Sequence, residues 1–127
     1  YNAINGLIQQ VFNPPEDLTL AELRERAERE DASIVVYNNT DITGLAGQTR
    51  DWLLSRQVTV SNVGNVPEAS GGPTLIRDYT GNVWTARYLA ELIGLPPERI
   101  QPGADGLTTE DVMVVAGPDI QPLLSGQ

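Results

Sequence analysis

The chain has 127 residues, enough for one domain with a core of its own and an appended segment. Its 17 acidic residues outnumber 8 basic residues, all of them arginine, and give a formal net charge of −9. Surfaces that bind nucleic acid need clustered basic residues, so we expect no nucleic acid partner. Histidine and cysteine are absent, which removes the usual zinc ligands and the commonest general base, and we expect no metal and no cofactor.

The first 31 residues have a helical pattern. Apolar residues at helical spacing predict a helix over residues 3–12, which Asn13-Pro14-Pro15 ends. A second helix follows, with Thr19 as its N-cap and Glu22 completing a capping box. We interpret residues 1–31 as a helical extension or linker. Because the chain starts without methionine or a signal-like run, we expect it to be a piece of a longer protein.

From residue 33 onward the pattern is strand, helix, strand, strand, helix, strand. This order predicts an α+β fold, a βαββαβ split-βαβ (ferredoxin-like) sheet with two helices on one face. The domain is expected to span residues 32–120, with a tail at 121–127, and residues 99–101 could add a short strand. The strands are expected at 34–37, 58–63, 74–79 and 112–116, and the helices at 44–55 and 82–94.

A polar loop follows the first strand. Its simpler interpretation is turn chemistry, in which Asp41 or Thr43 caps the next helix and Gly44 permits a tight turn. The alternative is a ligand-binding loop, because the free amides of a first helical turn can bind an anion or a sugar oxygen. The candidate ligand-binding residues are Asn38, Asn39, Thr40, Asp41, Thr43 and Gly44.

The helix over residues 82–94 has two apolar stripes, and one is enough to face a sheet. The second stripe consists of Trp84, Tyr88 and Leu92 and needs another cover. We favour cover by the helix over residues 3–12. The rival hypotheses are an interface, including a homodimer, and an aromatic platform for sugars.

Asp105, Glu110 and Asp111 lie in one polar loop. Their spacing does not fit an EF-hand, and glycoside hydrolysis needs two carboxylates held across a cleft. We therefore favour a solvated loop. No nucleophile elbow, P-loop or dinucleotide fingerprint is present, and no residue is assigned a catalytic role.

Four segments occur in a specific order: VVYNNTDITGLAGQT, VSNVGN, TLIRDY followed by ARYLAELIG, and DVMVVAGPD. Together they resemble the C-terminal domain of LytR-CpsA-Psr proteins of the bacterial cell envelope, over residues 33–116. Asn39 departs from the pattern, because that family usually has glycine there.

The resemblance implies a role in cell-wall assembly. The catalytic core of that family transfers glycopolymers from polyprenyl-pyrophosphate carriers to peptidoglycan outside the membrane, and none of its catalytic residues carries over to this domain. The resemblance therefore implies a non-catalytic accessory or binding module, extracytoplasmic and tethered through a membrane anchor outside this chain. Its implied partners are peptidoglycan or wall glycopolymer, a partner protein, or the catalytic core of the same protein, from which residues 1–31 would lead.

Two other functions remain as alternatives. A stand-alone carboxylate-dependent hydrolase acting on wall glycans would need two acids in a cleft, one with a raised pKa. A nucleic-acid regulator ranks last, because the charge of −9 disfavours it.

Overall fold

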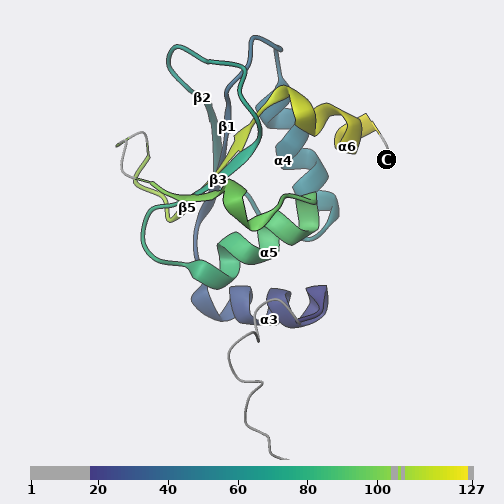
Figure 1. Ribbon diagram of the computed structural model, residues 1–127, viewed down its shortest axis with the longest axis vertical. Helices are drawn as coiled ribbons and strands as arrows, with labels where there is room; N and C mark the ends of the chain where they lie inside the picture. Colours follow the sequence, from purple (N-terminus) through teal and green to yellow (C-terminus); the bar gives the residue numbers. More distant parts are fainter. Residues whose placement is uncertain (1–17, 104–105, 107, 126–127) are drawn as a thin grey trace, which may run out of the picture.

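The structure is a computed structural model and describes residues 18–103, 106 and 108–125. Its centre is a five-stranded sheet with strand order β2-β1-β5-β3-β4. Helices α4 and α5 pack against one face of the sheet, and α3 lies against α5 (Figure 1). The main elements are α3 (Leu20–Glu30), β1 (Ile34–Asn38), α4 (Leu45–Ser55), β2 (Asn62–Asn65), β3 (Leu75–Asp78), α5 (Val83–Ile93), β4 (Ile100–Pro102), β5 (Val112–Ala116) and α6 (Gln121–Ser125); short 3₁₀ turns cover Pro97–Arg99 and Pro118–Ile120.

The α+β class, with an N-terminal helix before the strands, is confirmed. β1 runs parallel to both β2 and β5, whereas β3 runs parallel to β4 and antiparallel to β5. The strand order differs from the predicted split-βαβ (ferredoxin-like) arrangement in one respect: the two strands of β1–α4–β2 are direct neighbours, and so are those of β3–α5–β4, so no other strand lies between them. β4 is the short strand expected near residues 99–101.

β5 lies at the centre of the sheet, and this position explains its composition. All five of its residues are buried, because side chains on both of its faces are covered. Val112, Val114 and Ala116 pack in the core beneath the helices. Met113 and Val115 point to the opposite face, where Val35, Tyr37, Val66, Leu75 and Tyr79 surround them.

The second strand lies further along the chain than predicted. It spans Asn62–Asn65, whereas the alternating pattern predicted residues 58–63. Pairing with β1 begins where Ser61 N donates to Ile34 O at 2.8 Å, because β1 itself begins at Ile34. Residues 58–60 precede that point; the buried Val58 instead donates its amide to Leu53 O at 2.9 Å, at the end of α4.

α3 is joined to the rest of the fold by buried side chains. Its predicted capping box is confirmed: Glu22 N donates to Thr19 Oγ1 at 3.2 Å, and Thr19 N donates to Glu22 Oε1 at 2.9 Å. Leu23 and Ala27 point toward α5 and belong to the main core cluster. The helix predicted over residues 3–12 lies outside the described residues.

Candidate functional site

The polar loop after β1 closes on itself. The side-chain amide of Asn38 donates to Ile42 O at 2.7 Å, and its Oδ1 accepts from the backbone and hydroxyl of Thr40 at 2.9 and 2.6 Å. Thr40 Oγ1 in turn accepts from Ile42 N at 2.9 Å. These are the local side-chain to backbone bonds that form turns. Asn38 and Thr40 therefore hold the loop in shape.

Asn39 joins this loop to the connection between β2 and β3. Its side-chain amide donates to Ser70 Oγ at 3.0 Å, while its Oδ1 accepts from Ser70 N at 2.9 Å. Its backbone carbonyl also accepts from Gly71 N at 2.8 Å. Asn39 is buried, so these bonds satisfy a polar side chain that has left water. A glycine at this position would lack the side-chain bonds.

The start of α4 carries no side-chain cap. The N-cap is Gly44, with φ 81°, and neither Asp41 nor Thr43 bonds to the first turn, so the predicted capping is wrong. A left-handed N-cap suits glycine and leaves the first-turn amides without a side-chain acceptor. Asp41 and Thr43 are exposed and border a surface hollow of about 290 Å³ together with Asn65. Ligand binding at this loop stays a prediction.

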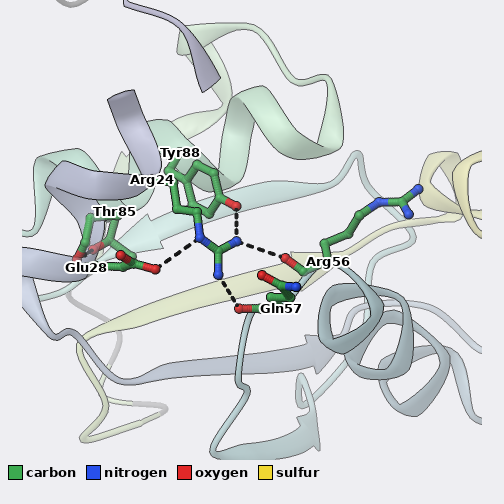
Figure 2. A network of polar contacts seen from close by, with 7 residues as sticks. Arg24, Glu28, Arg56, Gln57, Thr85 and Tyr88 are labelled. Atoms are coloured by element: carbon green, nitrogen blue, oxygen red, sulfur yellow. Dashed lines mark hydrogen bonds and ion pairs between the residues drawn. The ribbon is translucent and has the colours of Figure 1, made fainter. Parts of the chain in front are cut away.

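A polar cluster that sequence reasoning missed is centred on Arg24 of α3 (Figure 2). Its Nη1 donates to Tyr88 Oη at 3.0 Å and to Arg56 O at 3.1 Å, and its Nη2 donates to Gln57 O at 3.0 Å. Its Nε pairs with Glu28 at 3.0 Å. Arg56 is the C-cap of α4, so Arg24 places a cation at the negative end of that helix.

The charge state of Arg24 follows from these contacts. Partial burial disfavours the charged guanidinium, but hydrogen bonding and charge attraction from Tyr88 and Glu28 outweigh it and raise the pKa of Arg24. The residue therefore stays charged at any physiological pH. It borders a cavity of about 390 Å³ between α3, α5 and the α4–β2 connection, which Asp31, Thr59 and Thr85 also line.

Glu30, at the end of α3, caps α5. Its carboxylate accepts from Trp84 N at 3.1 Å and from both the backbone and the hydroxyl of Thr85 at 2.7 Å. The N-cap position itself, Asn82, makes no side-chain capping bond. Glu30 therefore supplies from another helix the acceptor that a helix N-terminus needs, and its charge suits the helix dipole.

The second stripe of α5 faces α3. Tyr88 is buried, and its hydroxyl accepts from Arg24. Trp84 is half-buried, with the Arg26 guanidinium 4.7 Å from its ring centre, and Leu92 is half-buried against the core. In the described residues the cover is thus α3, because residues 3–12 are not among them. An interface at Trp84, Tyr88 and Leu92 stays a prediction.

The acidic loop before β5 is bound to its surroundings. Asp111 accepts from Ser33 N at 2.9 Å and from Thr80 Oγ1 at 2.9 Å, and these bonds, the first above all, lower the pKa of Asp111. Glu110 accepts from Ser61 Oγ at 3.2 Å. Asp105 lies outside the described residues. A general acid at neutral pH needs a raised pKa, whereas the pKa of Asp111 is lowered.

The segment after β5 holds the start of β3. Asp119 Oδ1 accepts from the amide of Thr74 at 3.0 Å and also from its hydroxyl, and Oδ2 pairs with Arg99 at 3.3 Å. Burial alone would raise the pKa of Asp119, but the bonds from Thr74 and Arg99 lower it. Gly117 passes so close to this segment that a Cβ there would lie 2.1 Å from Gly72 O. In the sequence, Gly117 and Asp119 stand out only as part of the segment DVMVVAGPD, which carries the family resemblance.

Among the residues that the structure describes, no three histidine, cysteine or acidic side chains gather closely enough to hold a metal ion. In the same part of the chain, no helix has the length and apolar character needed to span a membrane.

The contacts above define a small α+β domain in which motif side chains hold loops and helices together. The family model described as "LytR cell envelope-related transcriptional attenuator" matches residues 31–119. The chain belongs to this family, in agreement with the resemblance seen in the sequence. Comparisons with curated proteins and with solved structures gave no match.

Proposed function

We propose that this domain is a non-catalytic accessory module of a cell-envelope glycopolymer transferase and takes part in cell-wall assembly. The module contacts wall glycan, a partner protein or the catalytic core of the protein to which it belongs. The module works outside the cytoplasmic membrane and is held there by an anchor outside this chain. Membership of a cell-envelope family supports this placement.

One observation carries the proposal: several polar side chains of the family segments bond within the domain. Asn38 and Thr40 close the loop after β1, Asp111 binds Ser33 and Thr80, and Asp119 binds Thr74. Catalysis needs groups that face a substrate, whereas these groups bond to the backbone and side chains of their own domain. Such an arrangement supports a stable binding platform.

The hydrolase alternative finds no support. It requires a carboxylic acid with a raised pKa beside a second carboxylate. Asp111 has a lowered pKa, and Glu110 is bonded to a serine hydroxyl. Hydrolysis of purified wall glycan by the chain would revive this alternative.

The test is binding to two targets that can be prepared separately. The chain is mixed with purified, insoluble peptidoglycan and sedimented, and in parallel it is titrated against the separately expressed catalytic core of its parent protein. We expect binding to at least one of them. If neither target retains the chain, wall glycan and the catalytic core are both contradicted as its partners.

A further inference from the structure

Helices α4 and α6 contact each other (Figure 1), and a surface groove is lined by residues of both. It consists of two surface hollows of about 650 and 380 Å³ that share Gln48 and Leu124 as lining residues. Gln121 of α6 lines the first hollow, and Trp52 of α4 lines the second. We refer to it as the α4–α6 groove. It lies apart from the Arg24 cluster, with which it shares no lining residue.

Trp52 carries a buried donor that lacks an acceptor. The side chain is 5% exposed, and its Nε1 is buried with no hydrogen-bond partner among the described residues. Buried indole N–H groups usually find a partner, because leaving one without an acceptor costs free energy. The Arg56 guanidinium lies 4.6 Å from the ring centre, so the ring is fixed by contact with a neighbouring cation.

The other residues of the groove present polar groups, and the charged side chain among them is paired. Gln48 and Gln121 are exposed, and each presents an amide that can both donate and accept. Leu124 adds an apolar contact. Within the described residues the lining includes no arginine, and its acidic member, Asp51, is paired with Arg50 at 3.2 Å. Such a surface suits hydroxyl and acetamido groups and disfavours a phosphate-rich polymer.

We propose that the α4–α6 groove binds the acetamido-sugar backbone of wall glycan. The amides of Gln48 and Gln121 bond to sugar hydroxyl and acetamido groups, and Leu124 contacts the apolar face of a ring. Trp52 lines the same groove, so a bound sugar ring lies beside its indole. The inference rests on the proposed function, from which it selects wall glycan among the three partners.

The test uses the full 127-residue chain and a soluble β-1,4-linked N-acetylglucosamine oligomer. The chain contains two tryptophans, so its nitrogen-15 NMR spectrum has two indole N–H signals, which Trp52→Phe assigns. We expect the oligomer to shift the Trp52 signal, while the signal of Trp84, half-buried under α3, stays in place. A response confined to Trp84, or no response of either signal at saturating oligomer, would overturn the proposal.

A variant that leaves the core intact provides the second measurement. Gln48→Ala combined with Gln121→Ala should weaken oligomer binding about tenfold, because it removes two hydrogen bonds. The matched control is Gln101→Ala, an exposed glutamine on β4, which should bind like the wild type. Unchanged affinity of the double variant would overturn the groove assignment.

The groove can fail while the proposed function stands. If the double variant still sediments with peptidoglycan as the wild type does, or if the wild type binds only the catalytic core, the groove assignment is overturned and the accessory role is kept. If the wild type binds neither target, the groove assignment fails together with the two tested partners of the proposed function. If the wild type prefers a phosphate-rich wall polymer to the acetamido-sugar oligomer, the assigned sugar class is wrong.

Discussion

The carboxylates of Glu30 and Asp119 bind backbone amides 45 to 55 residues away in the sequence. Glu30, at the end of α3, binds the first turn of α5. Asp119, in the turn after β5, binds the amide of Thr74 just before β3. An acceptor of this kind satisfies amides that would otherwise be left without a partner. At the level of single residues, the fold is therefore held by a few long-range polar contacts as well as by its apolar core.

The first prediction concerns the cap that α3 places on α5. Glu30→Ala should lower the free energy of unfolding by about 1–2 kcal/mol, a typical cost of losing a helix N-cap. Urea unfolding followed by circular dichroism measures it. Glu25→Ala is the matched control: it removes an exposed pair with Arg29 and should cost less than about 0.5 kcal/mol. Equal losses in the two variants would contradict the capping role.

The second prediction concerns the close approach at Gly117. A Cβ there would lie 2.1 Å from a backbone oxygen, so Gly117→Ala should force the segments apart and destabilise the domain by about 3 kcal/mol or more. Gly47→Ala is the opposite case. It lies within α4 with only the Arg50 side chain near its Cβ position, and alanine there should stabilise by about 0.5–1 kcal/mol. Thermal unfolding of both variants gives the comparison, and a Gly117→Ala variant as stable as the wild type would contradict the contact.

At the scale of elements, α3 extends the domain beyond the segment that matches the family. The match begins at residue 31, whereas α3 ends at Glu30. Yet Arg24 bonds to the end of α4, and Glu30 caps α5. Leu23 is buried within the main core cluster. We infer that α3 folds together with the domain.

A pair of leucines tests this inference. Leu23 is 1% exposed and Leu20 is 44% exposed, although both belong to the same helix. Leu23→Ala should lower the free energy of unfolding by about 2–4 kcal/mol, as expected for a buried leucine. Leu20→Ala should change it by less than about 0.5 kcal/mol. If α3 were only a linker, both substitutions would leave chemical unfolding unchanged.

The whole molecule has a formal net charge of −9. The fold favours the charged form of two of its carboxylates, Asp111 and Asp119. The pKa values of Asp111 and Asp119 are both lowered in the folded state. Protons therefore bind more readily to the unfolded chain as the pH falls. The stability that these groups contribute is present at neutral pH and is lost on acidification.

The pH dependence gives the fourth prediction. Unfolding free energy should decrease as the pH falls from roughly 5 toward and below the lowered pKa values of these two groups. Asp119→Asn should be less stable at neutral pH and should show a smaller decrease on acidification, because it has no charge to lose. Urea titrations at several pH values measure both slopes. Parallel pH profiles for the wild type and Asp119→Asn would contradict the role of Asp119.

The sequence predicts best what depends on neighbouring residues. The β-branched runs at 34–37 and 112–116 are strands, the Thr19–Glu22 capping box forms, and Gly94 ends α5 in a left-handed conformation with φ 94°. The shift of β2 depends on where β1 begins, which lies in another part of the chain. The contacts of Arg24, Glu30 and Asp119 join residues that no local pattern connects, and the cavities between helices exist only once those helices pack.

The position of β5 has a consequence for the order in which the chain can fold. β5 is the last strand in the chain, yet it lies between β1 and β3 and is the link between the β2–β1 pair and the β3–β4 pair. As a ribosome makes the chain, the two pairs of strands emerge before the strand that joins them. The domain can therefore complete its sheet only after residue 116 has been synthesised. We expect folding to be a late step, because the pairing of β5 with β1 and β3 joins residues far apart in the sequence.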